Sequence, residues 1–503
     1  MVFKPRLIRT LSRYTLLYSA LFVAFSLVNR YNCWLNLPPA SIHQWRQADG
    51  AAIAWNYSIN PQFEEPRINN LFFAGDSHAM GEFPGLYWLA GCMSRISGAP
   101  DFPLRWIGWF LLYTGGWAFG WIILQGTRKP QLAASGALLL LSAPVLGYYG
   151  PSSLPDAPAF CFVLIMMACL LRAHQLQSTG WLCAATLAAM LAISLKISCA
   201  ILPLALMATW WHGKRIRQWV EFPLWNSNWP ILSQILLITT ILLLRLWIFH
   251  YNKEHHAGYF LSSTRPIWQY DGSFILETLV LATRNVAPFF ASVGLYASML
   301  VGIWWYVRTW KKLSFLWKSL VIWSLVGSLG YFLLWFRMFR EHDYYALCLL
   351  VVPALLLLFG VEKWTEKQAD SKWNSILWVL CILGMLHSHW VLSNRLHTTG
   401  SNYLPADAFL DDPVYQQKSL PMNARWLCPE DPSPNTSLLA LRGFGWTAYN
   451  FGHKVAADTI QYYQVHHQLS HLALRDSSLY DSVYQSFFPR PMKGLNGWYF
   501  YGK

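Results

Sequence analysis

Long apolar segments alternate with short polar segments along most of the chain. A helix needs about 20 charge-poor residues to cross the roughly 30 Å hydrocarbon core of a bilayer. On this criterion the sequence predicts about eleven transmembrane helices, near residues 14–32, 103–124, 132–149, 158–171, 181–195, 197–211, 231–249, 286–307, 319–336, 346–361 and 375–393. The pattern therefore predicts an all-α polytopic membrane protein.

The composition supports this class and excludes an ordinary soluble domain. Only 12% of the 503 residues are charged, against about 25% in typical soluble proteins. Aromatic residues make up 17% of the chain, as expected where aromatic rings lie at membrane interfaces. The net charge of +14 resides mostly in short loops between apolar segments, so we expect no nucleic-acid partner.

The basic loops predict the topology. They contain the N-terminal basic residues, Arg128 with Lys129, Arg172, and the runs GKRIR, RTWKK and 363–372. Because Lys-rich and Arg-rich loops stay in the cytoplasm, we expect a cytoplasmic N-terminus, and an odd number of spans places the C-terminus outside. The first apolar segment lacks a small-residue cleavage pattern, so we interpret it as a retained anchor.

The composition changes near residue 395. Apolar runs give way to DAFLDDP, CPEDPSPNTS and RGFGWTAYNFG, and about 110 residues suffice for a small domain. The sequence therefore predicts a transmembrane domain over 1–394, with a first outer loop at 33–102, and an extracytoplasmic α/β domain over 395–503. Pairing among the outward cysteines Cys33, Cys92 and Cys428 stays open.

The stretch HQWRQADGAAIAWNY, residues 43–57, carries a charged pair just beyond the first span. Ser41 is suited to cap a new helix there, and Arg46 and Asp49 then lie on one face. One interpretation is an amphipathic interfacial helix with an ion pair between these residues. The other is a functional carboxylate beside a cation.

Further ionisable and aromatic residues map to the same outer side of the predicted membrane. They are Glu82 in GEFPGLYWL, Asp156 in LPDAPAF, Lys196 in SLKIS, and Arg337, Arg340, His342, Asp343, Tyr344 and Tyr345 in RMFREHDYYAL. Such residues are costly at membrane depth and commonly functional. The alternative for Lys196 and the two arginines is that their stems lie in lipid while the charge reaches the interface.

The order and sidedness of WRQADGAAIA, GEFPGLYWL, LPDAPAF, SLKIS and REHDYYAL resemble the GT-C glycosyltransferases. The resemblance is to the bacterial branch similar to protein mannosyltransferases and lipid A aminoarabinose transferases. It implies an enzyme of the bacterial inner membrane, which moves a sugar from a polyprenyl-phosphate donor to a lipid, glycan or protein acceptor at the outer face. It also implies Asp49 and Asp156 as catalytic residues. Relatives carry a lysine where this chain has Phe83, so the phosphate contact must come from elsewhere.

The chemistry of such a transfer agrees with these residue types. A sugar phosphate already has a good leaving group, so one carboxylate suffices, to take the proton of the acceptor hydroxyl or amine during an inverting attack. The departing phosphate needs cations, and arginine offers bidentate geometry. The candidates to bind the donor phosphate are Arg46, Lys196, Arg337, Arg340, His342, Tyr344 and Tyr345.

The outer loop HYNKEHHAGYF, residues 250–260, is rich in histidine. Some GT-C enzymes use a divalent ion and others use none, and a loop of this kind is also simply polar. If a divalent metal ion binds, Glu82 and His255 are the expected ligands.

Two other function classes compete with a transferase. A transporter for an anionic or lipid-linked substrate would also place charges around a membrane pathway. However, the charges gather on one face and not at mid-membrane, and no matched broken helices occur in two halves of the sequence. A non-catalytic scaffold or sensor with a working outer tail is the second alternative.

Overall fold

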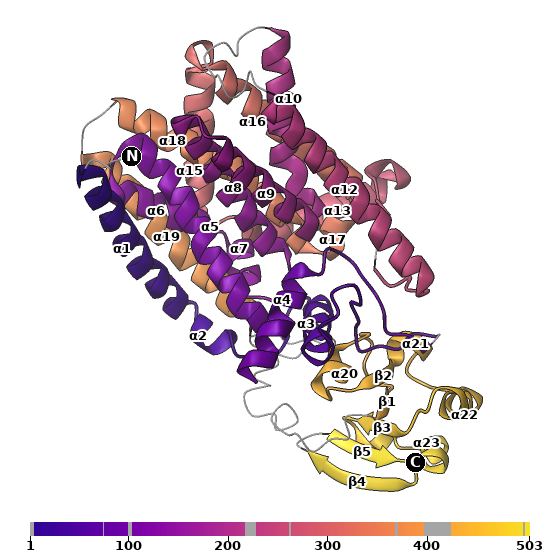
Figure 1. Ribbon diagram of the computed structural model, residues 1–503. Coiled ribbons are helices and arrows are strands. Elements are labelled where there is room, and N and C mark those ends of the chain that lie inside the picture. Colours follow the sequence, from indigo (N-terminus) through magenta and orange to yellow (C-terminus); the bar gives the residue numbers. More distant parts are fainter. Residues whose placement is uncertain are drawn as a thin grey trace.

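The computed structural model describes residues 5–73, 75–98, 103–216, 228–260, 263–367, 371–396, 424–495 and 498–503. Long helices form a bundle, and a small region with a β-sheet lies at one end of it (Figure 1). The first helix begins at the end of the bundle away from the sheet, and the C-terminus lies within the sheet region (Figure 1). The two ends of the described chain are therefore on opposite sides of the bundle.

The helices of the bundle overlap the predicted apolar segments, except that α13 (Gly272–Leu281) lies outside them. They are α1 (Pro5–Val28), α5 (Pro103–Thr127), α6 (Pro130–Leu141), α7 (Pro144–Tyr149), α8 (Asp156–Leu176), α9 (Thr179–Leu195), α10 (Ile201–Arg215), α12 (Trp229–Glu254), α13 (Gly272–Leu281), α14 (Ala287–Phe290), α15 (Val293–Arg308), α16 (Phe315–Leu334), α18 (Val351–Lys367) and α19 (Ser371–Leu396). Within the described ranges, seven helices are long and apolar enough to span a membrane. A pair bent by 98°, 272–290 with 293–308, makes an eighth if it counts as one span.

Among the described residues, fewer helices than the eleven predicted segments, several of which are short, are long enough to span a membrane alone. Residues 132–149 are divided between α6 and α7, because Pro144 begins a new helix and cannot continue the previous one. Residues 181–211 are divided at Lys196, whose extended backbone separates α9 from a short 3-10 turn and α10.

The chain reverses direction at Lys196. The hydroxyls of Thr186 in α9 and Ser233 at the start of α12 are 2.9 Å apart. The indole of Trp211, near the end of α10, donates to Gln234, also at the start of α12 (2.9 Å). The first half of α9 and the end of α10 thus both adjoin the start of α12, so α9 and α10 run in opposite directions, as the sequence predicted.

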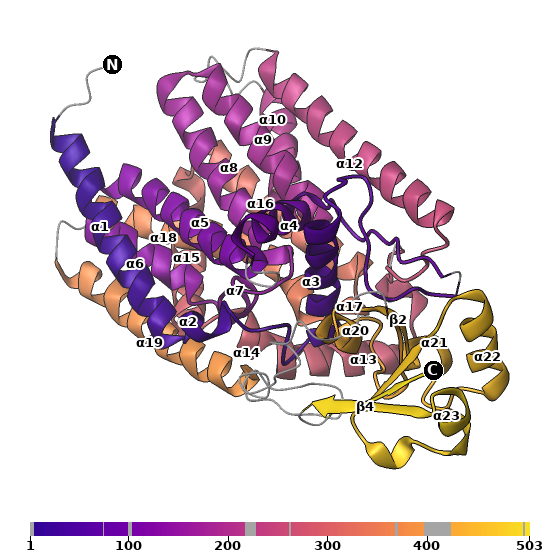
Figure 2. The same cartoon turned by 60° about the horizontal axis from the view of Figure 1, so that its bottom comes forward.

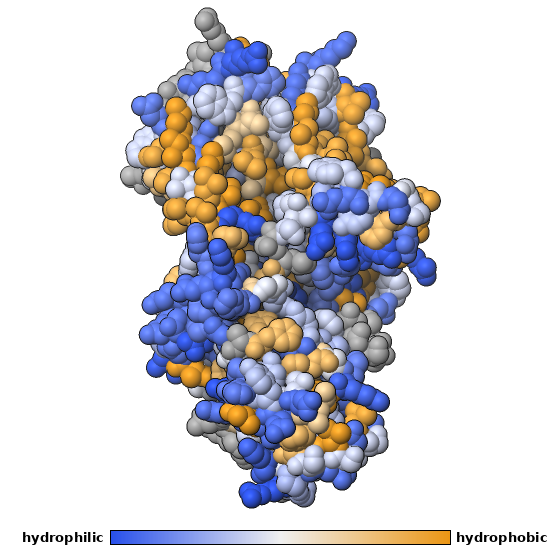
Figure 3. Space-filling model, turned by 90° about the vertical axis from the view of Figure 1, so that its right-hand side faces the viewer, coloured by the Kyte–Doolittle hydropathy of each residue, from blue (hydrophilic) through white to orange (hydrophobic). Residues whose placement is uncertain are grey.

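Apolar side chains cover the outside of the bundle. On the face shown in Figure 3, hydrophobic residues form a broad band in the upper half of the molecule, below a hydrophilic top, and hydrophilic residues predominate below the band. Exposed apolar side chains from α12 and α16 include Leu232, Ile235, Leu242, Leu246, Trp323, Val326 and Leu329. An apolar surface of this kind suits contact with lipid.

The C-terminal region contains a five-stranded sheet with strand order β2-β1-β3-β5-β4. The strands are β1 (Arg425–Cys428), β2 (Phe444–Thr447), β3 (His471–Leu474), β4 (Arg490–Leu495) and β5 (Trp498–Gly502), and the helices are α20 (Thr436–Ala440), α21 (Ala448–Phe451), α22 (Ala457–His466) and α23 (Ser482–Phe487). β1 pairs in parallel with β2 and β3, whereas β5 pairs antiparallel with β3 and β4. The expectation of a small α/β unit is confirmed. The DAFLDDP segment lies outside the described residues.

The first outer loop is attached to this sheet. Its two helices, α3 (Gln44–Ile59) and α4 (Gly85–Ser97), lie between the bundle and the sheet region, with α3 beside α20 (Figures 1 and 2). The backbone N–H of Leu71 donates to the carbonyl of Gly445, and Leu71 packs in the same core as Leu427 and Trp446. The loop and the sheet region therefore share one core across the two predicted domains.

Two details of the sequence interpretation are corrected here. Helix α3 begins at Gln44, and no side chain caps it; the hydroxyl of Ser41 donates instead to the carbonyl of Arg395. All nine cysteines of the chain are unpaired, which answers the open question about Cys33, Cys92 and Cys428.

Candidate active site

Asp49 is fully buried in the middle of α3. The amide nitrogen of Asn435 donates to its Oδ1 (2.6 Å), and the hydroxyl of Tyr259 donates to its Oδ2 (2.8 Å). Gly50 allows this close packing, because a Cβ there would lie 2.4 Å from the carbonyl oxygen of Ser153. Helix α3 can thus lie directly against the segment that precedes α8.

The environment of Asp49 raises its basicity. Burial raises the pKa of its carboxyl from 3.8 to about 6, although the charge of Arg46 and the two hydrogen bonds act in the opposite direction. Removal from water disfavours the charged form, whereas donors and a nearby cation favour it. Asp49 is therefore ionised at neutral pH but is a stronger base than an exposed aspartate.

Arg46, one turn before Asp49, forms an ion pair with Glu82, and the hydroxyl of Tyr87 donates to the same carboxylate. Burial alone would raise the pKa of Glu82, but the charge of Arg46 and the bond from Tyr87 lower it below its usual value. The interfacial-helix interpretation with an Arg46–Asp49 ion pair is thus wrong, since Arg46 pairs with Glu82. The other terminal nitrogen of Arg46, Nη1, is buried and has no hydrogen-bond partner.

Asp156 and Lys196 form the second buried ion pair. The ammonium of Lys196 lies 2.8 Å from Oδ1 of Asp156, and their side chains are 16% and 3% exposed. Asp156 is in the first turn of α8 and Lys196 follows the last residue of α9, positions at which each charge is favoured by a helix dipole. The ammonium also lies over the rings of Tyr344 (5.1 Å) and Tyr345 (4.6 Å). The charge of Lys196 helps to lower the pKa of Glu82, so both ion pairs belong to one site.

A third cluster of polar residues surrounds Asp343, close to the start of α3. Asp343, which begins a 3-10 segment (Asp343–Leu350), accepts from Tyr149 (2.5 Å) and pairs with Arg395 (2.5 Å) and His43 (3.2 Å). These partners come from α7, α19 and the residue before α3. The cluster therefore ties the start of α3 to three elements of the bundle.

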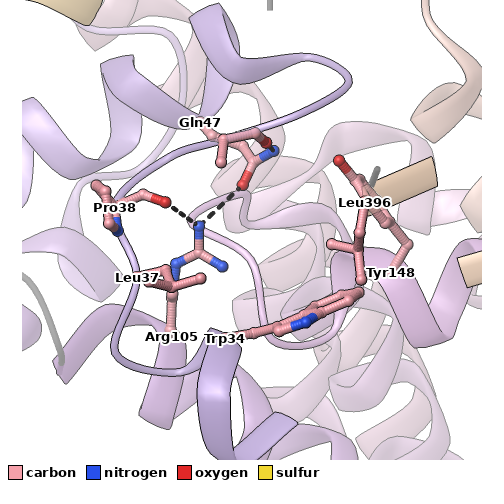
Figure 4. A pocket seen from close by; sticks show the side chains of 8 residues that line it. Trp34, Leu37, Pro38, Gln47, Arg105, Tyr148 and Leu396 are labelled. Carbon is pink, nitrogen blue, oxygen red and sulfur yellow. Dashed lines mark hydrogen bonds between the residues drawn. The ribbon is translucent and has the colours of Figure 1, made fainter. Parts of the chain in front are cut away.

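A small cavity beside this cluster is structural. The guanidinium of Arg105 donates to the carbonyl of Pro38 (2.9 Å) and lies 3.4 Å from the amide oxygen of Gln47, with Trp34 and Tyr148 nearby (Figure 4). The space holds little more than one water molecule, so no sugar fits. Arg105 thus positions the segment that leads into α3.

A protein-family model matches part of the chain. Residues 77–253, roughly a third of the chain, match the family model described as dolichyl-phosphate-mannose-protein mannosyltransferase. A comparison with curated protein sequences gave no match.

Solved structures extend the likeness to nearly the whole chain. ArnT from Cupriavidus metallidurans bound to undecaprenyl phosphate superposes with a TM-score of 0.61 at 12% identity, over 96% of this chain and 98% of that chain. Its apo form gives 0.58 at 12% identity over 96% and 97%. The apo oligosaccharyltransferase from Archaeoglobus fulgidus gives 0.50 at 10% identity over 91% and 69%. The chain therefore has the fold of ArnT, at 12% sequence identity. It is an integral membrane protein.

The structure does not bring Arg337 and Arg340 into the buried site. Arg337, the N-cap of α17 (Met338–Glu341), pairs with Glu341 at the end of that helix (2.8 Å). Arg340 binds both carboxylate oxygens of Glu277 in α13 (2.9 and 2.8 Å). The Arg337 side chain is 40% exposed and that of Glu277 is 57% exposed. The structure therefore gives no support to a phosphate contact by these two arginines.

His342 lies within the buried site but is not a cation. Burial, and then the charges of His43 and Lys196, lower its pKa to about 3. The imidazole is therefore neutral at physiological pH, which corrects the expectation that it supplies positive charge. Its Nδ1 is buried without a hydrogen-bond partner.

The predicted metal ligands Glu82 and His255 have different partners. The Glu82 carboxylate is occupied by Arg46 and Tyr87, whereas Nδ1 of His255 lies 2.7 Å from Oδ2 of Asp76. Asp76, His78 and His255 offer one ligand atom each within 4.8 Å of one another. Across the described part of the chain this is the one His, Cys, Asp and Glu group with such spacing, and its donor types suit zinc.

Sequence reasoning missed both hydrogen-bond donors to Asp49. Tyr259 and Asn435 lie 210 and 386 residues away from it. Nothing local marks either residue, because each reaches the site only through folding of a distant outer segment. Asp76 and His78 carried a weak signal, since two ligand types two residues apart in the first outer loop are typical of metal sites.

Proposed function

We propose that this protein is a membrane glycosyltransferase that moves a sugar from a polyprenyl-phosphate donor to a hydroxyl or amine of an acceptor. The observation that carries the proposal is the buried carboxylate of Asp49, with its raised pKa, beside Arg46. Arg46 and Lys196, each 16% exposed, both act on Glu82. The GT-C fold supports it, and ArnT of C. metallidurans binds undecaprenyl phosphate in its structure. The acceptor class, whether lipid, glycan or protein, is left to experiment.

Asp49 is the proposed general base. As the acceptor oxygen or nitrogen attacks the anomeric carbon, its proton passes to a free lone pair of the Asp49 carboxylate and the bond from the sugar to phosphate breaks. Attack opposite the leaving group inverts the anomeric centre. A pKa near 6 keeps the base ionised at neutral pH while making it a better proton acceptor than an exposed carboxylate.

Arg46 and Lys196 are the proposed contacts for the donor phosphate. Arg46 has a buried nitrogen without a partner, and Lys196 is fixed by Asp156 between that carboxylate and two tyrosine rings. Fixed positive charge in a site with little water stabilises the negative charge that builds up on the departing phosphate. These two residues then replace the family lysine at the position of Phe83. Asp156 acts by holding Lys196.

An apolar cavity between α8, α9, α10 and α12 suits the hydrocarbon of the donor. Its lining includes Ala189, Leu182, Pro203, Leu206 and Trp210. The lining residues nearest to Lys196 along the chain are Ala189 and Pro203, seven residues away on either side. At the helical rise of about 1.5 Å per residue, the cavity begins about 10 Å from the proposed phosphate contact. Apolar walls favour an isoprenoid chain.

The orientation and the metal are further parts of the proposal. We place the N-terminus in the cytoplasm and the sheet region outside, in a bacterial inner membrane, because the basic loops lie on the N-terminal side. If a divalent ion binds, its ligands are Asp76, His78 and His255, with no step of the transfer assigned to it.

The proposal is tested by comparing cell-envelope lipids and glycans in cells that carry the wild-type gene, no gene, or Asp49→Asn at equal protein level. Asparagine keeps the size of aspartate but cannot accept the proton, so one sugar-modified species should disappear while its unmodified acceptor accumulates. Measuring the same lipid species in each membrane leaflet distinguishes a glycosyltransferase from a transporter. A species that persists but changes leaflet would indicate a transporter instead.

A further inference from the structure

We infer that Asn435 is a positioning residue for the base Asp49, so that the C-terminal sheet region completes the active site. The inference rests on the proposed function of Asp49 as a base. It assigns to the C-terminal region a direct part in the chemistry, beyond covering the membrane domain.

The orientation of the Asn435 side chain is fixed by its hydrogen bonds. Its amide oxygen accepts from the backbone N–H groups of Asn69 (3.0 Å) and Asn70 (3.1 Å). Because an amide oxygen faces those two donors, the NH2 group must face Asp49, to which it donates at 2.6 Å. Asn435, Asn69 and Asn70 have no solvent exposure.

The two asparagines that hold Asn435 are themselves fixed to the sheet region. The Asn69 amide donates to the carbonyl of Gly443 (2.9 Å), and the amides of Asn70 and Asn450 donate to each other (2.8 and 3.0 Å). The backbone of Gly445 donates to the Asn69 carbonyl. Residue 445 must be glycine, since a Cβ would lie 1.9 Å from the carbonyl oxygen of Trp426. This connection leaves Asn435 little freedom.

The amide acts on the base in two ways. It holds one carboxylate oxygen while Tyr259 holds the other, which fixes the plane of the carboxylate toward the acceptor. It also favours the charged form, because an amide NH2 can only donate. The other ionisable groups that act on Asp49 are Arg46, Glu82 and Tyr449. Loss of the Asn435 amide leaves these groups in place. It removes one of the interactions that lower the pKa of Asp49, so the pKa should rise.

The test uses the full-length enzyme in lipid vesicles with a radiolabelled polyprenyl-phosphate sugar as the probe, and it follows kcat from pH 5 to 8. The variants are Asn435→Ala and Asn435→Ser, which keeps an oxygen near the Asn69 and Asn70 donors. Both should raise the pH of half-maximal kcat by at least about half a unit and lower kcat on the plateau about tenfold. The matched control is Asn450→Ala, which removes a buried amide from the same network without touching Asp49.

The outcomes separate this inference from the proposed function. The expected result is that the acidic limb, the part of the kcat profile that falls as the pH decreases, moves to higher pH in both Asn435 variants and does not move in Asn450→Ala. An unmoved limb with less folded protein would overturn the inference, since it would show a structural role alone. Failure of both variants to fold would overturn it as well. A wild-type enzyme that transfers no sugar at any pH would instead refute the proposed function.

Discussion

Two ion pairs in the protein have similar distances but different surroundings. The Asp156–Lys196 pair lies at 2.8 Å with side chains 3% and 16% exposed, and the Arg337–Glu341 pair lies at 2.8 Å with side chains 38% to 40% exposed. An exposed ion pair contributes about 0–1 kcal/mol to stability, and a buried one must offset the loss of hydration of both charges. The depth of the charge, and not its distance to a partner, distinguishes the two pairs.

Buried polar atoms without hydrogen-bond partners occur in the buried group of charges but not at Arg337 or Arg340. In the buried group they are Arg46 Nη1, Asp156 Oδ2 and His342 Nδ1. Such atoms also occur elsewhere in the described chain, Thr209 Oγ1 among them, so it is their coincidence with ion pairs of low exposure that distinguishes the buried group. We therefore expect substitutions in the buried group to affect catalysis strongly and those on the rim to have little effect.

The largest effect is expected for Lys196→Met. Methionine has similar length but no charge, so the leaving phosphate loses a fixed cation and turnover should fall by at least about 100-fold. The measurement is the initial rate of sugar release from the polyprenyl-phosphate donor, per folded enzyme, in vesicles.

Because Lys196→Met leaves Asp156 as a buried unpaired charge, it needs a control for folding. The double variant Asp156→Asn with Lys196→Met removes that charge. It should fold better than the single variant and remain as inactive. Wild-type turnover in the double variant would show that the phosphate is held elsewhere.

A smaller but clear effect is expected for Arg46→Lys. Lysine can keep the ion pair with Glu82 but has no planar fork and no second nitrogen free for the ligand. Turnover should fall by at least about tenfold, with unchanged membrane insertion and thermal midpoint. A kinetic comparison at saturating donor separates a loss of turnover from weaker binding, and equal turnover would exclude Arg46 as a transition-state contact.

Much of the fold was accessible from the sequence because the bilayer imposes a simple rule on span length and charge. The predicted segments fall on one helix or on two consecutive helices, and the reversal at Lys196 was predicted from one charge in an apolar run. The rule fails where Pro144 divides residues 132–149 into two helices shorter than the membrane, because helix length depends on local breaks that hydropathy does not register.

The site was only partly accessible from the sequence. Asp49, Glu82, Asp156 and Lys196 stand out as charges in apolar surroundings, and the structure brings them together. Charge alone could not separate them from Arg340, whose partner Glu277 lies 63 residues away. Nor could it identify Asn435, an uncharged residue whose role depends on how the sheet region packs on the first outer loop.

The pH dependence of activity tests whether the buried carboxylate of Asp49 is the base. Asp49 must be ionised to accept a proton, and its pKa is raised from 3.8 to about 6. Activity should therefore fall as pH decreases through 6, to about a tenth of the plateau at pH 5. The measurement is kcat between pH 5 and 8 at saturating donor. Full activity at pH 5 would mean that a group with a lower pKa is the base.

The raised pKa of Asp49 also affects stability. Activity should rise with pH through about 6, whereas the contribution of Asp49 to stability falls over the same range. A carboxyl whose folded pKa is raised favours folding when protonated, and this contribution is lost as pH rises through about 6. Ionised Asp49 thus destabilises the folded enzyme at neutral pH. Asp49→Asn should give an equal or higher thermal midpoint at pH 7, as measured by the unfolding of purified protein, and a clearly lower midpoint would contradict the raised pKa.

The smallest effect is expected for the rim arginines. Arg337→Ala and Arg340→Ala each remove one exposed ion pair worth about 0–1 kcal/mol, and neither residue contacts the buried cations in the structure. Turnover should stay within about twofold of wild type. Glu277→Gln is the matched control, because it breaks the bidentate pair but keeps Arg340. A tenfold loss in Arg340→Ala without a loss in Glu277→Gln would move the phosphate site to the rim, and depth would no longer distinguish functional from structural charges in this protein.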